Sequence, residues 1–238
     1  MQSLAAEALP NLSAAARQAS VSDLLAMTLR PNPADPRRMA QRAAAVALFS
    51  PYPGRREPKS ILAESLDGVD RKLLYPAVQA LLQNDDSVAR ASVRKVFNEL
   101  TDRDLVELLP AIVQAIERLA PSNEMFGDGI RLAGLDLLSR LHIREGMTLC
   151  VAVMEPARCG AGKRVEPCVQ YLQRYGAHAK AVLPQLREVR TQLAAAAGAK
   201  AKNEQVDRVD KCIAAIESST VRPTVISLSE FKSRPLAK

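Results

Sequence analysis

The residues of this chain best suited to chemistry lie in one loop, Arg158-Cys159-Gly160-Ala161-Gly162-Lys163-Arg164. Glycines followed by a lysine are typical of loops that bind phosphate through backbone amides. The loop is not a Walker motif, because Ala157 stands where the first glycine belongs and Arg164 where serine or threonine belongs. A helix, rather than the usual strand, is also expected before it. A weaker function remains open: free amides at a helix N-terminus, beside Arg158, Lys163 and Arg164, could hold an anion.

The cysteines and histidines do not form a metal-binding pattern. No two of the four cysteines have the close spacing of a structural zinc site, and neither histidine lies in an H-E or H-x-x-x-H pattern. Cys150 and Cys168 fall on apolar stripes and are expected in the core. Cys159, beside the basic residues of the loop, is the one candidate for a thiol of perturbed pKa. We expect no metal and no cofactor, and we expect His142 and His178 at helix ends.

Helices must position these residues, and the clearest pair of helices spans residues 73–100. Apolar residues recur on a 3.6-residue period in both helices: Leu74, Val78 and Leu81, then Val93, Val96, Phe97 and Leu100. The polar residues 84–87 separate the two helices and can satisfy backbone groups at both helix ends. A solvated face is expected on the other side of the second helix, formed by Arg90, Arg94, Lys95 and Glu99. Such a pair leaves apolar surface over, which neighbouring pairs would have to cover.

Prolines recur at matching places in later helices. Pro76, Pro110 and Pro184 stand in the contexts Leu-Tyr-Pro-Ala-Val, Leu-Leu-Pro-Ala-Ile and Val-Leu-Pro-Gln-Leu. Their spacings are 110 − 76 = 34 and 184 − 110 = 74, the second being two steps of 37. A proline inside a helix removes a backbone hydrogen bond and kinks the helix, so a recurring position indicates a repeated unit.

Two helix starts can be read from capping residues. Residues 101–104 have the form of a capping box, with Asp104 in place of the usual Glu or Gln. Ser22 is expected to cap a helix that continues to Leu29.

The segment of residues 73–100 resembles the HEAT repeat in three features. It has an apolar first helix with a proline, a polar turn with aspartate, and a second helix that opens on Val88 with Ser92 four residues later. The resemblance covers roughly residues 69–219. It departs from the repeat pattern at Ala89, where an arginine is usual, and Arg90 follows one position late. Residues 73–190 also resemble an uncharacterised family of bacterial helical-repeat proteins, in which such blocks form the C-terminal part of longer chains. The resemblance implies an all-α fold, a right-handed α–α superhelix (solenoid) of about four HEAT-like helical hairpins.

Three segments follow from this interpretation. Residues 1–66 are expected to form an N-terminal helical cap with a Pro-rich connector, residues 67–219 the HEAT-like repeats, and residues 220–238 an extended C-terminal tail. Residues 224–228 of the tail are β-prone and are expected to lie along the last helices. Met125 and Phe126 lie in a longer turn, where they either cover the core or form an apolar contact site.

The basic charge of the chain is concentrated in its C-terminal part. Residues 143–238 hold 16 Lys and Arg against 9 Asp and Glu, an excess equal to the net charge of +7. The candidate contacts to an anion or to a partner are Arg158, Lys163, Arg164, Arg174, Lys180, Arg187 and Arg190. Such a surface could follow a nucleic-acid backbone, and some basic proteins similar to HEAT repeats are DNA glycosylases. This chain has no Trp, and its four Tyr and four Phe are scattered, which argues against a base-stacking site.

Composition also bears on location. No run reaches the roughly 18 to 20 apolar residues needed to span a bilayer. The N-terminal residues lack the charged and apolar regions of a signal peptide. A cytoplasmic location is favoured for the chain as given.

Three function classes are compatible with these features. The first is a non-catalytic scaffold that binds a protein partner or another domain of a longer parent chain. The second is a nucleic-acid-binding module that uses the basic C-terminal half. A HEAT-scaffold enzyme ranks third, because the sequence offers neither His-Glu pairs nor a convincing nucleophile.

Overall fold

The computed structural model describes residues 12–30, 39–50, 60–84, 86–118, 127–158, 160–197 and 204–234. These residues fold almost entirely into helices, and the one β-type pairing among them is an isolated parallel bridge between Ile143 and Ile226. The expected all-α class is therefore confirmed. Met125, Phe126 and Cys159, all singled out above, lie outside the described residues.

The chain divides into two compact units. One comprises residues 1–115 and 119–130, and the other comprises residues 116–118 and 131–238. The division falls inside the run of residues 67–219 that the sequence pattern treats as repeats, so each unit is described by itself.

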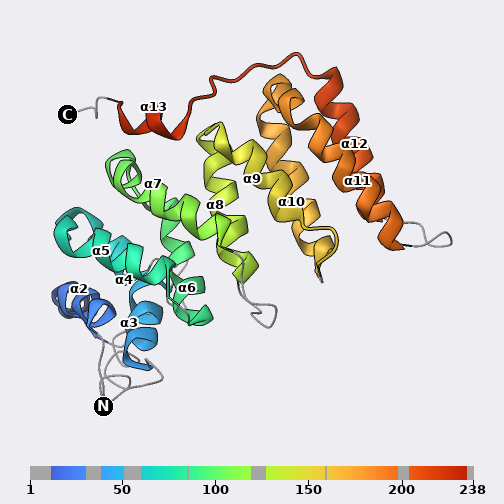
Figure 1. The fold of residues 1–238 in the computed structure, drawn as a ribbon. Coiled ribbons are helices and arrows are strands. Elements are labelled where there is room, and N and C mark those ends of the chain that lie inside the picture. The colour runs from blue at the N-terminus through green and yellow to red at the C-terminus, as the bar shows by residue number, and fades with distance from the viewer. Residues whose placement is uncertain are drawn as a thin grey trace. The chain divides into compact units, whose positions relative to one another are not determined.

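Helices of the first unit pack as pairs. They are α2 (Ala14–Leu29), α3 (Met39–Phe49), α4 (Ile61–Ser65), η2 (Leu66–Gly68), α5 (Arg71–Leu82), α6 (Ser87–Val93), η3 (Arg94–Asn98) and most of α7 (Asp102–Glu117) (Figure 1). Helix α2 packs on α3 and α5 on α6, while α2 also packs on α5 and α3 on α6. First helices therefore contact first helices, and second helices contact second helices. The stripes expected for residues 73–100 form the core between them, and all seven of their apolar residues are buried.

Capping residues set where two of these helices begin. Ser13 caps α2, since its Oγ accepts a hydrogen bond from the amide of Ala16 at 3.3 Å. The expectation that Ser22 is the cap is wrong, because the helix begins at Ala14 and Ser22 lies in its interior. The Ala-rich turn after Ser13 favours this earlier start. The capping box before α7 is confirmed, because Asp104 N donates to Thr101 Oγ1 at 3.3 Å and Thr101 N donates to Asp104 Oδ2 at 3.1 Å.

The second unit repeats the paired arrangement. Its helices are most of α8 (Gly127–Arg140), α9 (Glu145–Met154), α10 (Ala161–Arg174), η4 (Gly176–Val182), α11 (Leu183–Ala197), α12 (Glu204–Ser218) and α13 (Leu228–Lys232). Helix α9 packs on α10 and α11 on α12, while α9 also contacts α11 and α10 contacts α12. The same rule of first helix on first helix holds here.

The recurring prolines do not all occupy helix interiors. Pro76 lies inside α5 and Pro110 inside α7, as expected. Pro184 is instead the second residue of α11, directly after the 3₁₀ turns of η4. Proline is well tolerated there, because the first turn of an α-helix does not need its amide for an intrahelical bond. Helix α10 contains an interior proline that the pattern did not include, Pro167.

An extended segment runs from Ser219 to Ser227, but residues 228–232 of the tail predicted to be extended form a helix, and the extended segment does not follow the last helices. It runs back from α12 across one end of the second unit and finishes in α13 (Figure 1). There it pairs with the α8–α9 turn and with η4 through Ile143 and Ala177. The free backbone groups of that turn provide hydrogen-bond partners that the sides of α11 and α12 lack.

Gly176 fits the tail against η4, which makes it a sensitive position. It adopts φ +55°, and a Cβ there would clash with the carbonyl oxygen of Val221. Gly176→Ala is therefore expected to lower the free energy of unfolding by about 1–2 kcal/mol. It should also speed amide exchange in residues 219–228. Gly68→Ala is the matched control: Gly68 has no positive φ, and its added Cβ would make only an ordinary contact at 3.6 Å with Gln18. Urea unfolding and amide exchange measure both effects, and equal losses in the two variants would contradict the role given to Gly176.

Candidate functional site at the α9–α10 turn

A hollow of about 490 Å³ lies between the α9–α10 turn and α11. Its lining comes from Glu155, Pro156, Ala157 and Arg158 of the turn and from Gln192 of α11. Charged side chains gather beside it, including two of the cations of the loop at residues 158–164. The hollow is therefore a candidate place in the second unit for binding or chemistry.

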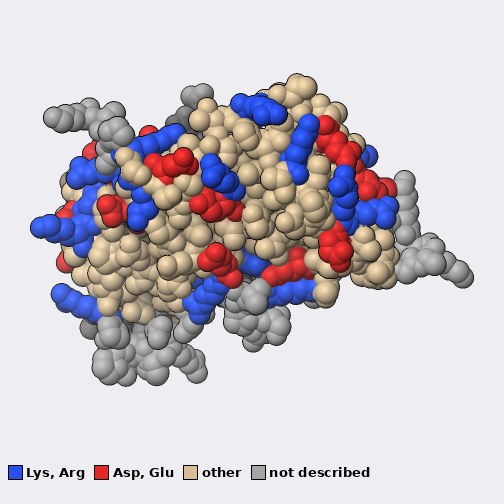
Figure 2. All heavy atoms as spheres, turned by 45° about the horizontal axis from the view of Figure 1, so that its top comes forward, with Lys and Arg blue, Asp and Glu red and all other residues tan. Residues whose placement is uncertain are grey.

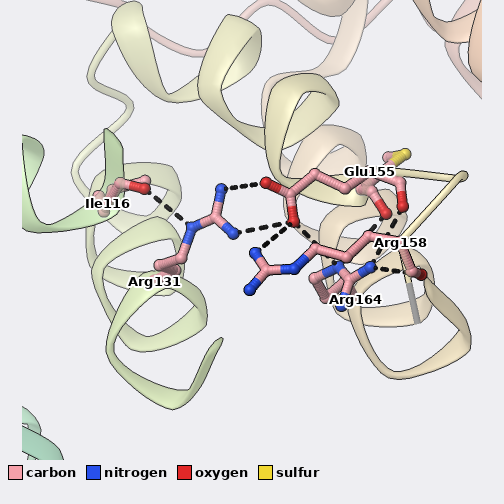
Figure 3. Close-up of polar contacts among 6 residues, drawn as sticks. Ile116, Arg131, Glu155, Arg158 and Arg164 are labelled. Atoms are coloured by element: carbon pink, nitrogen blue, oxygen red, sulfur yellow. Dashed lines mark hydrogen bonds and ion pairs between the residues drawn. The ribbon is translucent and has the colours of Figure 1, made fainter. Parts of the chain in front are cut away.

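Glu155 is the centre of this charged group. It ends α9 in the left-handed conformation, with φ 41°. Arg131 of α8 binds its carboxylate through both oxygens, with Nη1 3.1 Å from Oε2 and Nη2 3.0 Å from Oε1 (Figure 3). Arg158 adds a bond from Nη1 to Oε2 at 3.1 Å, and Arg164 Nε lies 3.6 Å from the same oxygen. We call these four residues the Glu155 cluster.

The protonation state of Glu155 follows from its surroundings. Burial alone would raise the pKa of this carboxyl, but the hydrogen bonds and positive charges of Arg131 and Arg158 outweigh burial and leave the pKa below its ordinary value. Glu155 is thus ionised at neutral pH and is poorly suited to donate a proton there. Its arrangement fits a structural anchor better than a general acid.

Arg164 has an internal role. Its side chain is 1% exposed. Its guanidinium donates to the carbonyl oxygens of Met154 at 3.4 Å, Glu155 at 3.2 Å and Arg158 at 3.0 Å. The carbonyls of Met154 and Glu155 are ones that the end of α9 leaves unsatisfied, and the carbonyl of Arg158 belongs to the turn that follows. Of the three cations proposed to hold an anion, Lys163 faces solvent and Arg158 borders the hollow, while Arg164 is directed into the protein.

Buried arginines recur at the corresponding place in three successive helix pairs. Arg90 is the fourth residue of α6, Arg131 the fifth of α8 and Arg164 the fourth of α10, and all three are buried. Each donates to a carbonyl at the end of the preceding helix: Arg90 Nη1 to Asn84 O at 2.9 Å, Arg131 Nε to Ile116 O at 2.9 Å, and Arg164 as given above. In these three pairs an arginine in the first turns of the second helix thus bonds to the end of the first helix.

The sequence interpretation missed this feature. Arg90 was expected on the solvated face, yet it is 5% exposed, so that expectation is wrong. The signal was available, because Arg90 lies three residues before Val93 and seven before Phe97, on the apolar stripe itself. In the first helix pair a neutral side chain makes similar bonds: Gln41 of α3 donates to Thr28 O at 3.3 Å and to Arg30 O at 3.5 Å.

The other candidate cations pair with acidic residues on neighbouring helices. Arg174 binds Asp136 Oδ1 at 2.7 Å and lies over the ring of Tyr171 at 5.1 Å. Arg190 binds Asp210 at 3.1 Å. Arg187 pairs with Glu217, and Lys180 is exposed on η4. On the face shown in Figure 2, basic and acidic side chains alternate over α11 and α12 instead of forming one basic patch.

A second buried carboxylate lies in the first unit. Asp104 is 0% exposed, and its Oδ1 accepts hydrogen bonds from Arg71 Nε at 3.1 Å and Tyr75 OH at 3.0 Å. Its Oδ2 accepts from Thr101 Oγ1 at 2.7 Å and from the Thr101 amide. Burial would raise the pKa of Asp104, but the bonds from Thr101 and Arg71 outweigh burial and hold the pKa below its ordinary value. This carboxylate joins α5 to the start of α7.

Three cysteines of the described chain are buried and form no disulfide: Cys150, Cys168 and Cys212. Burial and the neighbouring Cys168 raise the pKa of Cys150 well above its ordinary value, and burial raises the pKa of Cys212 to about 12. The expectation that Cys150 and Cys168 belong to the core is confirmed.

We therefore expect these three thiols to resist labelling in the native protein. Cys150, Cys168 and Cys212 should react with a maleimide or with Ellman's reagent only in denaturant, at rates at least about tenfold higher than in the native state. Mass spectrometry of tryptic fragments assigns the labelled positions. Fast native labelling at any of the three would contradict the described core.

Two further properties concern metals and membranes. Within the described residues, no three His, Cys, Asp or Glu side chains lie close enough to hold one metal ion. None of the described helices is both long and apolar enough to cross a bilayer.

Comparisons with protein-family models, with curated proteins and with solved structures returned no match. The resemblance to HEAT repeats thus stays a prediction, and the function has to be argued from the geometry alone.

Proposed function

We propose that this chain is a non-catalytic helical-repeat scaffold that binds a protein partner or another domain of a longer parent chain. The observation that carries the proposal is the recurring geometry of the helix pairs. First helices pack on first helices, and second helices pack on second helices. In three of the pairs a buried arginine near the start of the second helix bonds to a backbone carbonyl at the end of the first helix or in the turn that follows it. The superhelix of about four HEAT-like hairpins belongs to this proposal as its architecture.

Repeated helix pairs favour binding over catalysis for a physical reason. Each pair uses its apolar stripes and its buried charges to hold its neighbours, which leaves the exposed helix faces free to vary with the partner. The buried ionisable groups of this chain fit a role in holding the helices together. Arg131 and Arg158 keep Glu155 ionised, Thr101 and Arg71 keep Asp104 ionised, and the described thiols with raised pKa values are protonated at neutral pH. A HEAT-scaffold enzyme therefore ranks third here as well.

A nucleic-acid-binding module is the second candidate. Lys163 and Lys180 are exposed on the basic second unit, which supports contact with phosphates. The ion pairs Arg174–Asp136, Arg187–Glu217 and Arg190–Asp210 count against it, because a neutralised arginine adds little to the electrostatic attraction of a phosphate backbone.

The direct test is capture from an extract of the native host. The full chain serves as bait, the extract is treated with nuclease, and retained proteins are quantified by mass spectrometry. We expect one protein in an amount comparable to the bait, recovered with and without nuclease. Recovery that nuclease abolishes, or no protein enriched over empty resin, would contradict the scaffold proposal.

A gel shift separates the two candidates. Labelled single-stranded and duplex DNA are titrated with the wild-type chain and with the Lys163→Glu, Lys180→Glu double variant at about 50 mM salt. The scaffold proposal expects no shift from either protein. A shift by the wild type that the double variant loses would favour the nucleic-acid module.

A further inference from the structure

The C-terminal segment, residues 219–234, contacts the α8–α9 turn through its backbone. Ile226 donates its amide to His142 O at 3.2 Å, and its carbonyl accepts from the Arg144 amide at 2.7 Å. These two bonds flank Ile143 and form the isolated parallel bridge. The bridge therefore fixes which residue of the segment lies beside the turn.

A buried aromatic side chain anchors the same segment. Phe231 is 4% exposed, and it is the one buried residue among residues 219–234. Its position is set by α13, which begins at the capping box of Ser227 and Glu230. The guanidinium of Arg234 lies over the Phe231 ring at 5.8 Å. Phe231 is thus the main apolar contribution of the segment to the second unit.

The start of α13 is held by a charged acceptor. The amide of Leu228 donates to both carboxylate oxygens of Glu145, each at 3.0 Å. Hydrogen bonds to a carboxylate are stronger than those between neutral groups. The Leu228 side chain is half-buried, and it lies three residues before Phe231 on the same face of α13. The bridge, this bond and the anchor all fall within residues 226–231, so we expect them to form and break together.

The part of the segment nearest α12 is held less firmly. Val221 O accepts a hydrogen bond from the Ala177 amide at 2.8 Å. The Val221 side chain is nevertheless 68% exposed, and Arg222 and Thr224 also face solvent. Residues 219–225 can therefore change their path without removing a buried side chain from the core.

The elements that receive the segment have internal bonds of their own. The Ile143 amide donates to Leu138 O at 2.9 Å, which closes the end of α8, and the Tyr175 hydroxyl donates to Ile143 O at 2.9 Å. At the start of η4 the His178 amide donates to Tyr175 O at 3.1 Å. None of these bonds involves residues 219–234, so the departure of the segment leaves them in place.

We propose that residues 219–234 form a latch on the second unit, which opens as one piece while α9 to α12 stay folded, with Phe231 as its anchor. Opening costs one buried aromatic side chain and a few hydrogen bonds, which is far less than unfolding of the helix core costs. The amides of Arg144 and Ala177 are bonded to the latch when it is closed and face solvent when it is open. This inference concerns motion within the chain and does not depend on the scaffold proposal.

Native-state amide exchange, followed by NMR on the full chain in a series of low urea concentrations, tests the latch. Arg144, Ala177, Ile226 and Leu228 report on it, because each amide is bonded across the contact. We expect these four amides to share one opening free energy with a weak dependence on urea. They should exchange at least about tenfold faster than the core amide of Val169 in α10, whose exchange should depend steeply on urea.

Phe231→Ala removes the anchor. It should lower the protection of the four reporter amides at least about tenfold, while the Val169 amide remains protected because α10 stays folded. Lys232→Ala is the matched control, since Lys232 is exposed in the same helical turn and its removal should leave the four amides as protected as in the wild type. Far-UV circular dichroism checks that both variants keep their helices.

Three results would overturn the latch. In the first, the four reporter amides depend on urea as steeply as Val169 does, so that the segment unfolds only with the helix core. In the second, the four amides have different opening free energies, so that the segment does not open as one piece. In the third, Arg144 and Ala177 keep their wild-type protection in Phe231→Ala. The urea series on the wild type decides the first two outcomes even if Phe231→Ala does not fold.

Discussion

Arg131→Ala is expected to lower the free energy of unfolding by about 3–5 kcal/mol, among the largest effects of any single substitution in the described chain. The side chain of Arg131 is 4% exposed. It holds both oxygens of Glu155 and the carbonyl of Ile116. Alanine would leave a partly buried carboxylate and a buried carbonyl without their principal donor. Urea unfolding followed by far-UV circular dichroism measures the loss.

Two matched variants test the cause. Arg140→Ala removes a solvent-exposed arginine from the same helix, whose pair with Asp136 at 3.1 Å is worth less than about 1 kcal/mol. Arg131→Lys keeps the charge but has no planar fork to reach the carboxylate and the carbonyl together, so an intermediate loss is expected. Similar losses for Arg131→Ala and Arg140→Ala would show that the Glu155 cluster is not structural.

Asp104→Ala is expected to have the second large effect, a loss of about 3–4 kcal/mol. Asp104 is fully buried, and its removal leaves hydrogen-bond donors of Arg71, Tyr75 and Thr101 without their acceptor. Asp102→Ala is the control in the same helix turn, because Asp102 is exposed and contributes at most a small interaction with the helix dipole. Urea unfolding at neutral pH compares the two variants, which should differ by at least about 2 kcal/mol.

Asp104 also predicts a pH dependence. Its pKa in the folded protein is below the ordinary value, so its stabilisation is fully present above the ordinary pKa and is lost as the pH falls through the lowered folded pKa. The gap in stability between the wild type and Asp104→Asn should therefore be constant at neutral pH and close in acid. A gap that widens as the pH falls would contradict the assigned direction.

Sequence patterns were sufficient to predict those parts of the fold that depend on residues close together in the sequence. The stripes of residues 73–100 and the capping box at Thr101 are confirmed, because helical period and capping act within one or two turns. Pro184 and Ser22 were misplaced for local reasons as well. A 3₁₀ segment precedes Pro184, and a better cap precedes Ser22.

The candidate site could not be predicted in the same way. Gln192 meets the α9–α10 turn only because α11 packs on α9, and Arg131 reaches Glu155 across 24 residues of sequence. The cations of the loop at residues 158–164 suggested an external anion. The sequence shows that these side chains are charged, but it does not show the carboxylate and the backbone carbonyls inside the protein that bind them. The path of the tail to Ile143 likewise depends on which backbone groups the fold leaves free.

The recurring arginine explains how charge can serve architecture in a strongly basic chain. Three buried guanidinium groups, those of Arg90, Arg131 and Arg164, donate to backbone carbonyls at the end of the preceding helix or in the turn that follows it. The helix itself has no donor for these carbonyls. These residues add to the net charge but offer little of it to a partner. We therefore expect the chain to attract nucleic acid less strongly than its net charge of +7 suggests.

The most direct test of this account is a double-mutant cycle between Arg131 and Glu155. Free energies of unfolding are measured for the wild type, Arg131→Ala, Glu155→Ala and the double variant. If the cluster holds the helix pairs together, the two substitutions should be coupled by about 2 kcal/mol, with the double variant much less destabilised than the sum of the single ones. A coupling energy below about 0.5 kcal/mol would contradict the account, because the arginines would then be available for some purpose other than architecture.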